Sequence, residues 1–250
     1  MKYLAGLITL LCFHFTLAAQ EAGTITYAQT VRLEFKFEGA PPPQMGRDMP
    51  KEHTLQMVLI RKGDEVQYRL KDQGEPGNDM NFTSEEGGQV NIRMAPPQDI
   101  LYENLADARF IEQKEFLGKK FLIKDALPTF EWKLTGKSKQ ILDYPCQEAI
   151  LQDTSKNVVA WFSPMIPWQL GPGKYAGLPG LILEIIQDDG QRVLTATSVE
   201  LSEPAVAIEV PDKGKEVTQE EYDKIVEEKM KEMGGRPGSG GQIHMIIRQN

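Results

Sequence analysis

The segment from Leu178 to Ile186 constrains the fold of this chain more than any other. Its Pro179-Gly180 pair fits a type II turn, because proline pre-sets the backbone at the second position and glycine accepts the positive φ that the third position requires. The apolar run after this turn is interrupted only by Glu184, so both faces of a strand here would be largely covered. Asp188-Asp189-Gly190 is typical of a hairpin turn and returns the chain into a second strand ending near Leu201. We therefore predict a β-hairpin at the centre of the fold.

Alternating apolar and polar residues predict strands through most of the remaining chain. The alternation is cleanest from Ile25 to Phe37, where the odd positions are mainly apolar. Shorter strands are predicted at Leu55–Arg61, Val66–Leu70, Val90–Met94, Phe110–Phe116, Lys119–Lys124, Trp132–Thr135, Tyr144–Gln152, Val158–Phe162 and Ala205–Val210. The turn-forming residues between them favour an antiparallel meander over parallel strands joined by helices.

A helical period appears only near the C-terminus. Thr218 and Glu221 form a capping box, and one face of the following helix carries Tyr222, Ile225, Val226, Met230 and Met233. Gly234-Gly235 ends the helix. We therefore predict a mainly β protein, a strongly curved antiparallel sheet or open barrel with a C-terminal α-helix.

The two ends of the chain carry signals of their own. Residues 1–19 contain a lysine, an apolar stretch and small residues before Gln20, which is the pattern of a signal peptide. Residues 20–233 are predicted to form a single β-rich domain, and residues 234–250 a flexible glycine-rich tail. No later stretch approaches the ~20 apolar residues of a spanning helix, so we do not expect an integral membrane protein. We expect a periplasmic protein, with outer-membrane association or secretion as the alternatives.

Composition and motifs argue against several kinds of chemistry. The net charge is −8 and no basic patch is present, so nucleic-acid binding is not expected. Only His53 and His244 follow the predicted signal peptide, too few for a zinc site of three imidazoles and unfavourable for a catalytic triad. We expect no cofactor, no metal site built from these residues and no catalytic residue. A carboxylate pair for glycoside chemistry stays open, because distant strands can bring two acids together.

Cys146 is the most reactive candidate, because it is the only cysteine after the predicted signal peptide. Between Tyr144 and Ala149 on a predicted strand, it is expected to be a small buried hydrophobe, with a redox or metal role as the alternative. Methionine, histidine and cysteine together select copper(I), so copper or soft-metal handling is a further alternative.

Three motifs carry a resemblance to a known family. Gly177–Ile182 reads GLPGLI, Tyr144–Ala149 is similar to Tyr-x-Cys-x-x-Ala, and Ala160–Pro167 is similar to Ala-Trp-Phe-Thr-Pro-x-Ile-Pro, with Ser163 in place of threonine. The chain resembles the GLPGLI family of exported Bacteroidota proteins from about Glu115 to Asp189. The resemblance implies export, a β-rich fold and a Bacteroidota host, and it implies no reaction. By fold-level analogy alone we expect similarity to half-barrel lipid carriers of the cell envelope.

Aromatic and proline residues gather in and just before the segment Ser163–Pro179. They include Trp161, Phe162, Pro167, Trp168 and Tyr175. Such residues could form the rim of an apolar groove, or they could cover the open end of the sheet. Glu184 is either the polar group of such a cavity or, as we favour, the solvent-facing residue of its strand. Pro179 and Gly180 have a structural role in the turn.

These observations lead to one hypothesis and two alternatives. We expect a non-enzymatic cell-envelope protein that binds an apolar ligand or a partner protein through the Ser163–Pro179 segment. The first alternative is a partner module of outer-membrane machinery that acts through a sheet edge or the tail. The second is the copper or soft-metal handling protein.

Overall fold

A computed structural model describes most of the chain after residue 20. It covers residues 21–33, 35–36, 51–71, 78–83, 89–94, 98–153, 157–234 and 244–245. Side chains are described in residues 21–33, 51–71, 98–153 and 157–232. The predicted signal peptide, residues 1–19, and most of the predicted tail, residues 234–250, lie outside the described residues.

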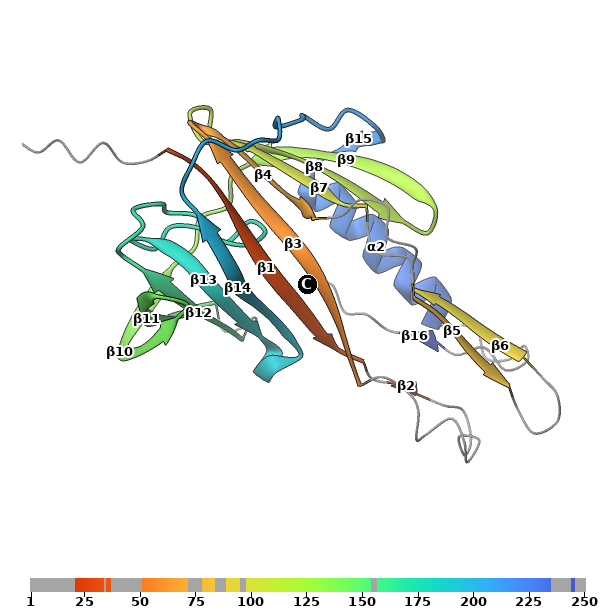
Figure 1. The fold of residues 1–250 in the computed structure, drawn as a ribbon. Helices are drawn as coiled ribbons and strands as arrows, with labels where there is room; N and C mark the ends of the chain where they lie inside the picture. The colour runs from red at the N-terminus through yellow and green to blue at the C-terminus, as the bar shows by residue number, and fades with distance from the viewer. Residues whose placement is uncertain are drawn as a thin grey trace, which may run out of the picture.

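Twelve strands form one open sheet (Figure 1). In spatial order they are β10 (Trp132–Ile141), β11 (Tyr144–Leu151), β12 (Val158–Ser163), β13 (Leu181–Gln187), β14 (Arg192–Glu200), β1 (Ala22–Arg32), β3 (Glu52–Lys62), β4 (Glu65–Leu70), β7 (Ile100–Asn104), β8 (Arg109–Phe116), β9 (Lys119–Ala126) and β15 (Lys215–Val217). Two separate pairs join β5 (Asn78–Thr83) to β6 (Gln89–Met94) and β2 (Phe35–Lys36) to β16 (His244–Met245). Every pairing is antiparallel except that of β9 with β15.

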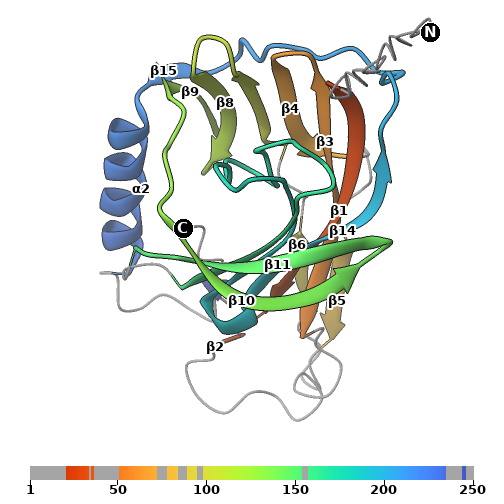
Figure 2. The same cartoon turned by 90° about the vertical axis from the view of Figure 1, so that its left-hand side faces the viewer.

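The sheet is strongly curved but does not close into a barrel, as the sequence predicts. Figure 2 shows it curling around the chain between β12 and β13. We call this stretch, residues 164–180, the interior segment. The helix α2 (Gln219–Gly234) lies beside β9. It is the single α-helix of the described residues, and it is not long and apolar enough to span a membrane.

The central hairpin is confirmed. Gln187 pairs with Arg192, and the intervening Asp188, Asp189 and Gly190 take φ values of 47°, 54° and 88°. The turn before β13 differs from the prediction. The Gly180 amide donates to the Leu178 carbonyl at 2.8 Å, which makes a γ-turn centred on proline instead of a type II turn.

Gly180 is required there by close packing as well as by its backbone angle. It has a φ of 153°, and a Cβ at this position would lie 2.2 Å from the Ser163 carbonyl oxygen. The glycine therefore lets the end of the interior segment press directly against the end of β12.

Most of the other predicted strands are present with slightly shifted ends. The odd positions of β1 are buried from Gly23 to Gln29, which confirms the first part of the alternation predicted for Ile25 to Phe37. β1 ends at Arg32, and Phe37 lies outside the described residues. The predicted strand at Ala205–Val210 is wrong, because the chain between β14 and β15 is irregular and Val206 and Val210 are both exposed. The helix start is confirmed: the Thr218 amide donates to Glu221 at 2.8 Å and the Glu221 amide donates to the Thr218 hydroxyl at 3.2 Å.

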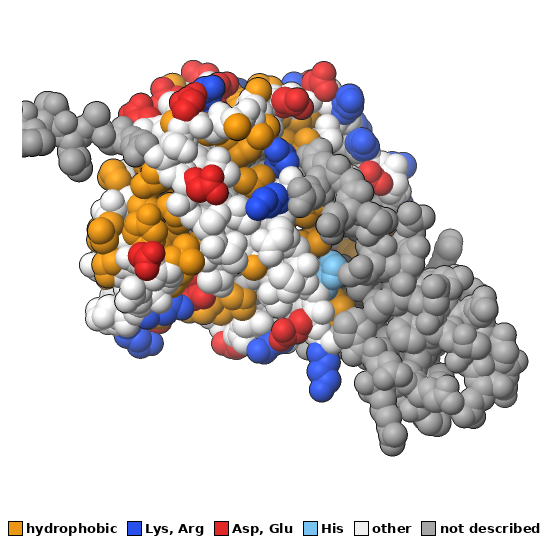
Figure 3. Space-filling view, viewed as in Figure 1, with side chains coloured by type: hydrophobic (Ala, Val, Ile, Leu, Met, Phe, Trp, Pro, Cys, Tyr) orange, Lys and Arg blue, Asp and Glu red, His pale blue; other side chains and the backbone are white. Residues whose placement is uncertain are grey.

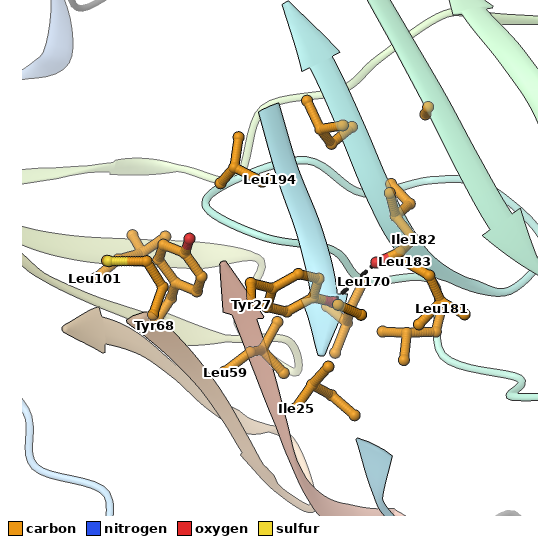
Figure 4. Close-up of a cluster of buried hydrophobic side chains, with 14 of the residues drawn as sticks. Ile25, Tyr27, Leu59, Tyr68, Leu101, Leu170, Leu181, Ile182, Leu183 and Leu194 are labelled. Atoms are coloured by element: carbon orange, nitrogen blue, oxygen red, sulfur yellow. Dashed lines mark hydrogen bonds between the residues drawn. The ribbon is translucent and has the colours of Figure 1, made fainter. Parts of the chain in front are cut away.

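The core lies between the concave face of the sheet and the interior segment. Ile25, Tyr27 and Leu59 from β1 and β3 meet Leu181 and its neighbours from β13 (Figure 4). The Tyr27 hydroxyl donates to the Ile182 carbonyl at 2.8 Å, which ties β1 to the start of β13. On α2 the expected apolar face packs through Tyr222, whose ring lies 5.4 Å from the Phe121 ring, and through Ile225 and Val226. Met230 on the same predicted face is exposed instead.

Candidate functional site

The interior segment has a buried side and an exposed side that alternate along the chain. Ile166, Trp168 and Leu170 are buried, whereas Pro167 and Gln169 between them and Met165 before them are exposed. The Leu181 amide donates to the Ile166 carbonyl and the Ile182 amide to the Leu170 carbonyl, both at 2.9 Å. The segment is thus bonded to the start of β13 through its backbone.

Two of the aromatic residues predicted to form a groove rim belong to the core. Trp168 is 1% exposed, and the Arg61 guanidinium lies 5.2 Å from its ring centroid. A Cβ at Gly23 would come within 2.8 Å of the same indole, so β1 passes directly against it. Phe162 is also 1% exposed. Neither side chain is accessible to a ligand in this structure.

Trp161 and Glu184 lie side by side on β12 and β13 and are both buried. The Lys139 ammonium from β10 pairs with the Glu184 carboxylate and lies 4.4 Å from the Trp161 ring centroid. The Thr195 hydroxyl donates to the same carboxylate at 3.0 Å. The favoured interpretation of Glu184 as a solvent-facing residue is therefore wrong, because a lysine and a threonine from neighbouring strands hold it within the protein.

A second ion pair repeats this arrangement two strands closer to the edge. The Lys137 ammonium lies 3.0 Å from the buried Glu148 carboxylate of β11, and the Thr135 hydroxyl donates to that carboxylate at 2.8 Å. Two lysines of β10 are therefore anchored to acids on the strands behind it.

Tyr175 is the half-buried aromatic residue of the interior segment, and it stacks with two aromatics near the start of β10. Its ring centroid lies 5.3 Å from that of Phe130 and 6.2 Å from that of Trp132. The Trp132 indole donates to the Ala176 carbonyl at 2.9 Å, and Gln187 donates to the Tyr175 hydroxyl at 2.8 Å. We call Phe130, Trp132 and Tyr175 the aromatic cluster.

The strand next to the aromatic cluster is one edge of the sheet. β10 has 10 residues, and its positions 133–138 are all exposed. Among the described residues it pairs only with β11. Gly136 has a φ of 80° and lies where the register with β11 shifts, which marks a bulge.

The opposite edge of the sheet is short and covered. β15 has only 3 residues, and it leads directly into α2, which packs against β9. Figure 3 shows apolar side chains gathered on the side of the molecule that carries β10–β13. Leu134 on β10 and Met165 in the interior segment are among the large apolar side chains that are more than half exposed. Leu134 and Met165 thus accompany the long edge strand, although Leu117 and Val206 in other parts of the protein are also more than half exposed.

Buried charges fix the interior segment to the other half of the sheet. The Lys174 ammonium lies 2.8 Å from the Glu112 carboxylate of β8 and donates to the Gln219 side chain of α2 at 2.8 Å. The Lys114 ammonium lies 3.3 Å from the same carboxylate. Burial alone would raise the pKa of Glu112, but the two ammonium groups outweigh burial and lower it.

At two further acids of this region, burial outweighs the nearby cations. Burial raises the pKa of Glu103 to about 7 and that of Asp99 to about 6. Asp99, Glu103 and Glu112 come from the consecutive strands β7 and β8 and the residue before them, and not from distant strands. Because Glu112 is already held by two lysines, these groups form an internal charge network and not a pair of free carboxylates.

Cys146 is buried, as expected. Its thiol donates to the Tyr144 carbonyl at 3.4 Å, and burial raises its pKa to about 11. No group of three or more histidine, cysteine, aspartate or glutamate side chains within the described residues could hold a metal ion. The copper hypothesis stays a prediction.

Comparison with known proteins adds a partial family match. Residues 150–184 match the profile of a family described as "Protein of unknown function (Porph_ging)". This stretch runs from the end of β11 through β12 and the interior segment into β13. No curated protein matches the chain.

Two solved structures share a distant similarity with the chain. They are described as "Structure of PNGF-II in P21 space group" and "Structure of PNGF-II in C2 space group", with TM-scores of 0.49 and 0.47 and identities of 16% and 17%. Each comparison covers 82% of this chain but only 33% and 32% of the respective solved chains. The chain thus spans about a third of the length of these structures, and neither assigns it an activity.

Proposed function

We propose that this chain is a non-enzymatic binding protein of the cell envelope that holds a partner protein at the β10 edge. The observation that carries the proposal is the contrast between the two edges of the sheet. β10 offers 10 residues and an adjoining aromatic cluster, whereas β15 offers 3 residues followed by a helix. Unpaired backbone groups on a long edge strand are a template for a further strand.

A partner protein suits this geometry better than an apolar small molecule. The indole of Trp168 and the ring of Phe162 are packed in the core, so they cannot line an open groove. Of the other predicted rim residues of this segment, Pro167 is exposed and Tyr175 is half-buried. Export to the envelope rests on the pattern of residues 1–19.

Photo-crosslinking in the native cell envelope tests the proposal. A benzoylphenylalanine residue at the exposed Ser138 of β10 is expected to capture a discrete partner. The matched control carries the same residue at the exposed Lys119 of β9, at the other end of the sheet order. Equal capture at both positions, or capture at Lys119 alone, would contradict the assignment of the β10 edge.

A further inference from the structure

The charge and aromatic content of β10 indicate what kind of chain segment can pair with it. The strand carries Lys133, Lys137 and Lys139 and no acidic residue, although the whole protein has a net charge of −8. We propose that the β10 edge binds an extended, acidic segment of a different protein by strand addition, with an aromatic residue of that segment packing on the aromatic cluster. This inference rests on the proposed function and names the chemistry of the partner.

Two of the three lysines are anchored to acids on the strands behind β10, and the third is exposed. Glu148 anchors Lys137, whose side chain is nevertheless 71% exposed. Glu184 anchors Lys139, whose side chain is 35% exposed. Lys133 is exposed at the other end of the strand. Because the Lys139 ammonium reaches back to β13, a paired strand would mainly meet the exposed Lys133 and Lys137 side chains. Opposite charges on paired strands are stabilising, each by roughly 0.2–1 kcal/mol.

The same lysines disfavour a second copy of this chain as the occupant. Antiparallel pairing of two β10 strands would bring two sets of three lysines together, and like charges on paired strands are destabilising. The bulge at Gly136 would also interrupt the pairing in both copies. Lysines and bulges commonly protect edge strands from identical chains. Here they leave the edge open to a chain of opposite charge.

The aromatic cluster supplies an anchor at one end of the edge. Phe130 and Trp132 have ring centroids 5.9 Å apart, and Tyr175 packs against both. All three side chains are half-buried, so part of each ring faces solvent. The hydrogen bonds of Trp132 to Ala176 and of Gln187 to Tyr175 fix two of the rings. A fixed, partly exposed aromatic surface favours contact with an aromatic side chain.

Binding of synthetic peptides to the purified protein tests this chemistry. The probe is acetyl-YTEVEVEV-amide with a fluorescent label, measured by anisotropy at low ionic strength. A matched peptide with lysine in place of each glutamate is expected to bind at least about ten-fold more weakly, because several attractive pairs become repulsive. The affinity of the acidic peptide is expected to fall as salt is added. Equal affinity for the two peptides would overturn the acidic assignment.

Three protein variants locate the site. Lys133→Glu is expected to weaken binding of the acidic peptide several-fold, whereas Lys119→Glu, with the same charge change on β9, leaves it unchanged. Phe130→Ala is expected to weaken binding of YTEVEVEV but not of ATEVEVEV, because only the first peptide uses the aromatic cluster. Equal effects of the two lysine variants would overturn the site.

The outcomes separate this inference from the proposed function. Failure of all peptides to bind, together with capture of a partner from Ser138, would overturn strand addition of an acidic segment while leaving a partner at β10. Absence of capture at Ser138 would overturn the proposed function itself. A dimer that forms with rising protein concentration and slows amide exchange in residues 132–141 would show that the occupant is a second copy, contrary to the inference.

Discussion

Two buried tyrosines with different surroundings allow a stringent test of the packing that holds the interior of the sheet. Tyr27 and Tyr68 stack edge to face with ring centroids 6.4 Å apart, and both are at least nine-tenths buried. The Tyr27 hydroxyl donates to the Ile182 carbonyl at 2.8 Å, whereas the Tyr68 hydroxyl has no hydrogen-bond partner among the described residues. Substitution by phenylalanine removes one oxygen atom at either position and keeps both rings.

The two substitutions are therefore expected to have different effects on the free energy of unfolding. Tyr27→Phe loses a buried hydrogen bond and leaves its acceptor unpaired, which costs about 1–2 kcal/mol. Tyr68→Phe removes a hydroxyl that is buried without compensation, so the expected change lies between zero and a gain of about 1 kcal/mol. The two variants should thus differ by about 2 kcal/mol.

Urea unfolding followed by tryptophan fluorescence measures this difference, provided that both variants keep the parental m-value. The double variant is a further control, because the rings remain in contact and its effect should be close to the sum of the single effects. A loss for Tyr68→Phe as large as that for Tyr27→Phe would refute the reasoning. It would mean that the Tyr68 hydroxyl has a partner in solution.

Three further predictions concern the acids, the turn and the thiol. The pKa of Glu103 is raised from 4.5 to about 7 in the folded protein. Between pH 4.5 and 7 the folded protein therefore holds a proton that the unfolded chain has lost. The free energy of unfolding should therefore fall as pH rises from 4.5 to 7, and Glu103→Gln should remove up to roughly 3 kcal/mol of that fall; an unchanged pH profile would contradict the burial of an unpaired acid. Gly180→Ala should lower the free energy of unfolding in urea by at least about 2 kcal/mol, because its Cβ would meet the Ser163 carbonyl. Gly63→Ala should cost about 1 kcal/mol, because Gly63 has a φ of 62° but nothing lies within 4 Å of an added Cβ. Equal losses would mean that the backbone angle alone matters. The Cys146 thiol should react with a disulfide reagent only after unfolding, because it is 1% exposed and its pKa is raised; rapid reaction of the folded protein would be inconsistent with this burial.

Local features of the fold could be predicted from the sequence. The hairpin at Asp188-Asp189-Gly190 and the capping box at Thr218 depend on residues close in the chain, and both are present. The predicted type II turn at Pro179-Gly180 is wrong, because the Leu181 amide donates to the Ile166 carbonyl and not to the Leu178 carbonyl across the turn. Ile166 and Leu181 are far apart in the sequence, so the residues of the turn alone do not predict this hydrogen bond.

The candidate site could be predicted only in part. Tyr175 was identified, but its partners Phe130 and Trp132 come from a stretch more than 40 residues earlier and give no signal of proximity. Glu184 looked like a solvent-facing residue because the alternation of its own strand says nothing of Lys139, which reaches it from β10. The length of β10 was also missed, since Gly136 reads as a strand end whereas the chain continues through it as a bulge.

Amide hydrogen exchange of the purified protein, with and without acetyl-YTEVEVEV-amide, tests the central claim most directly. Strand addition at β10 predicts slower exchange in residues 132–141, where unpaired amides gain carbonyl partners. It also predicts no change in β15 or in α2 at the other edge. Unchanged exchange in β10 under conditions where the peptide is bound, or slowing at β15 instead, would contradict the account.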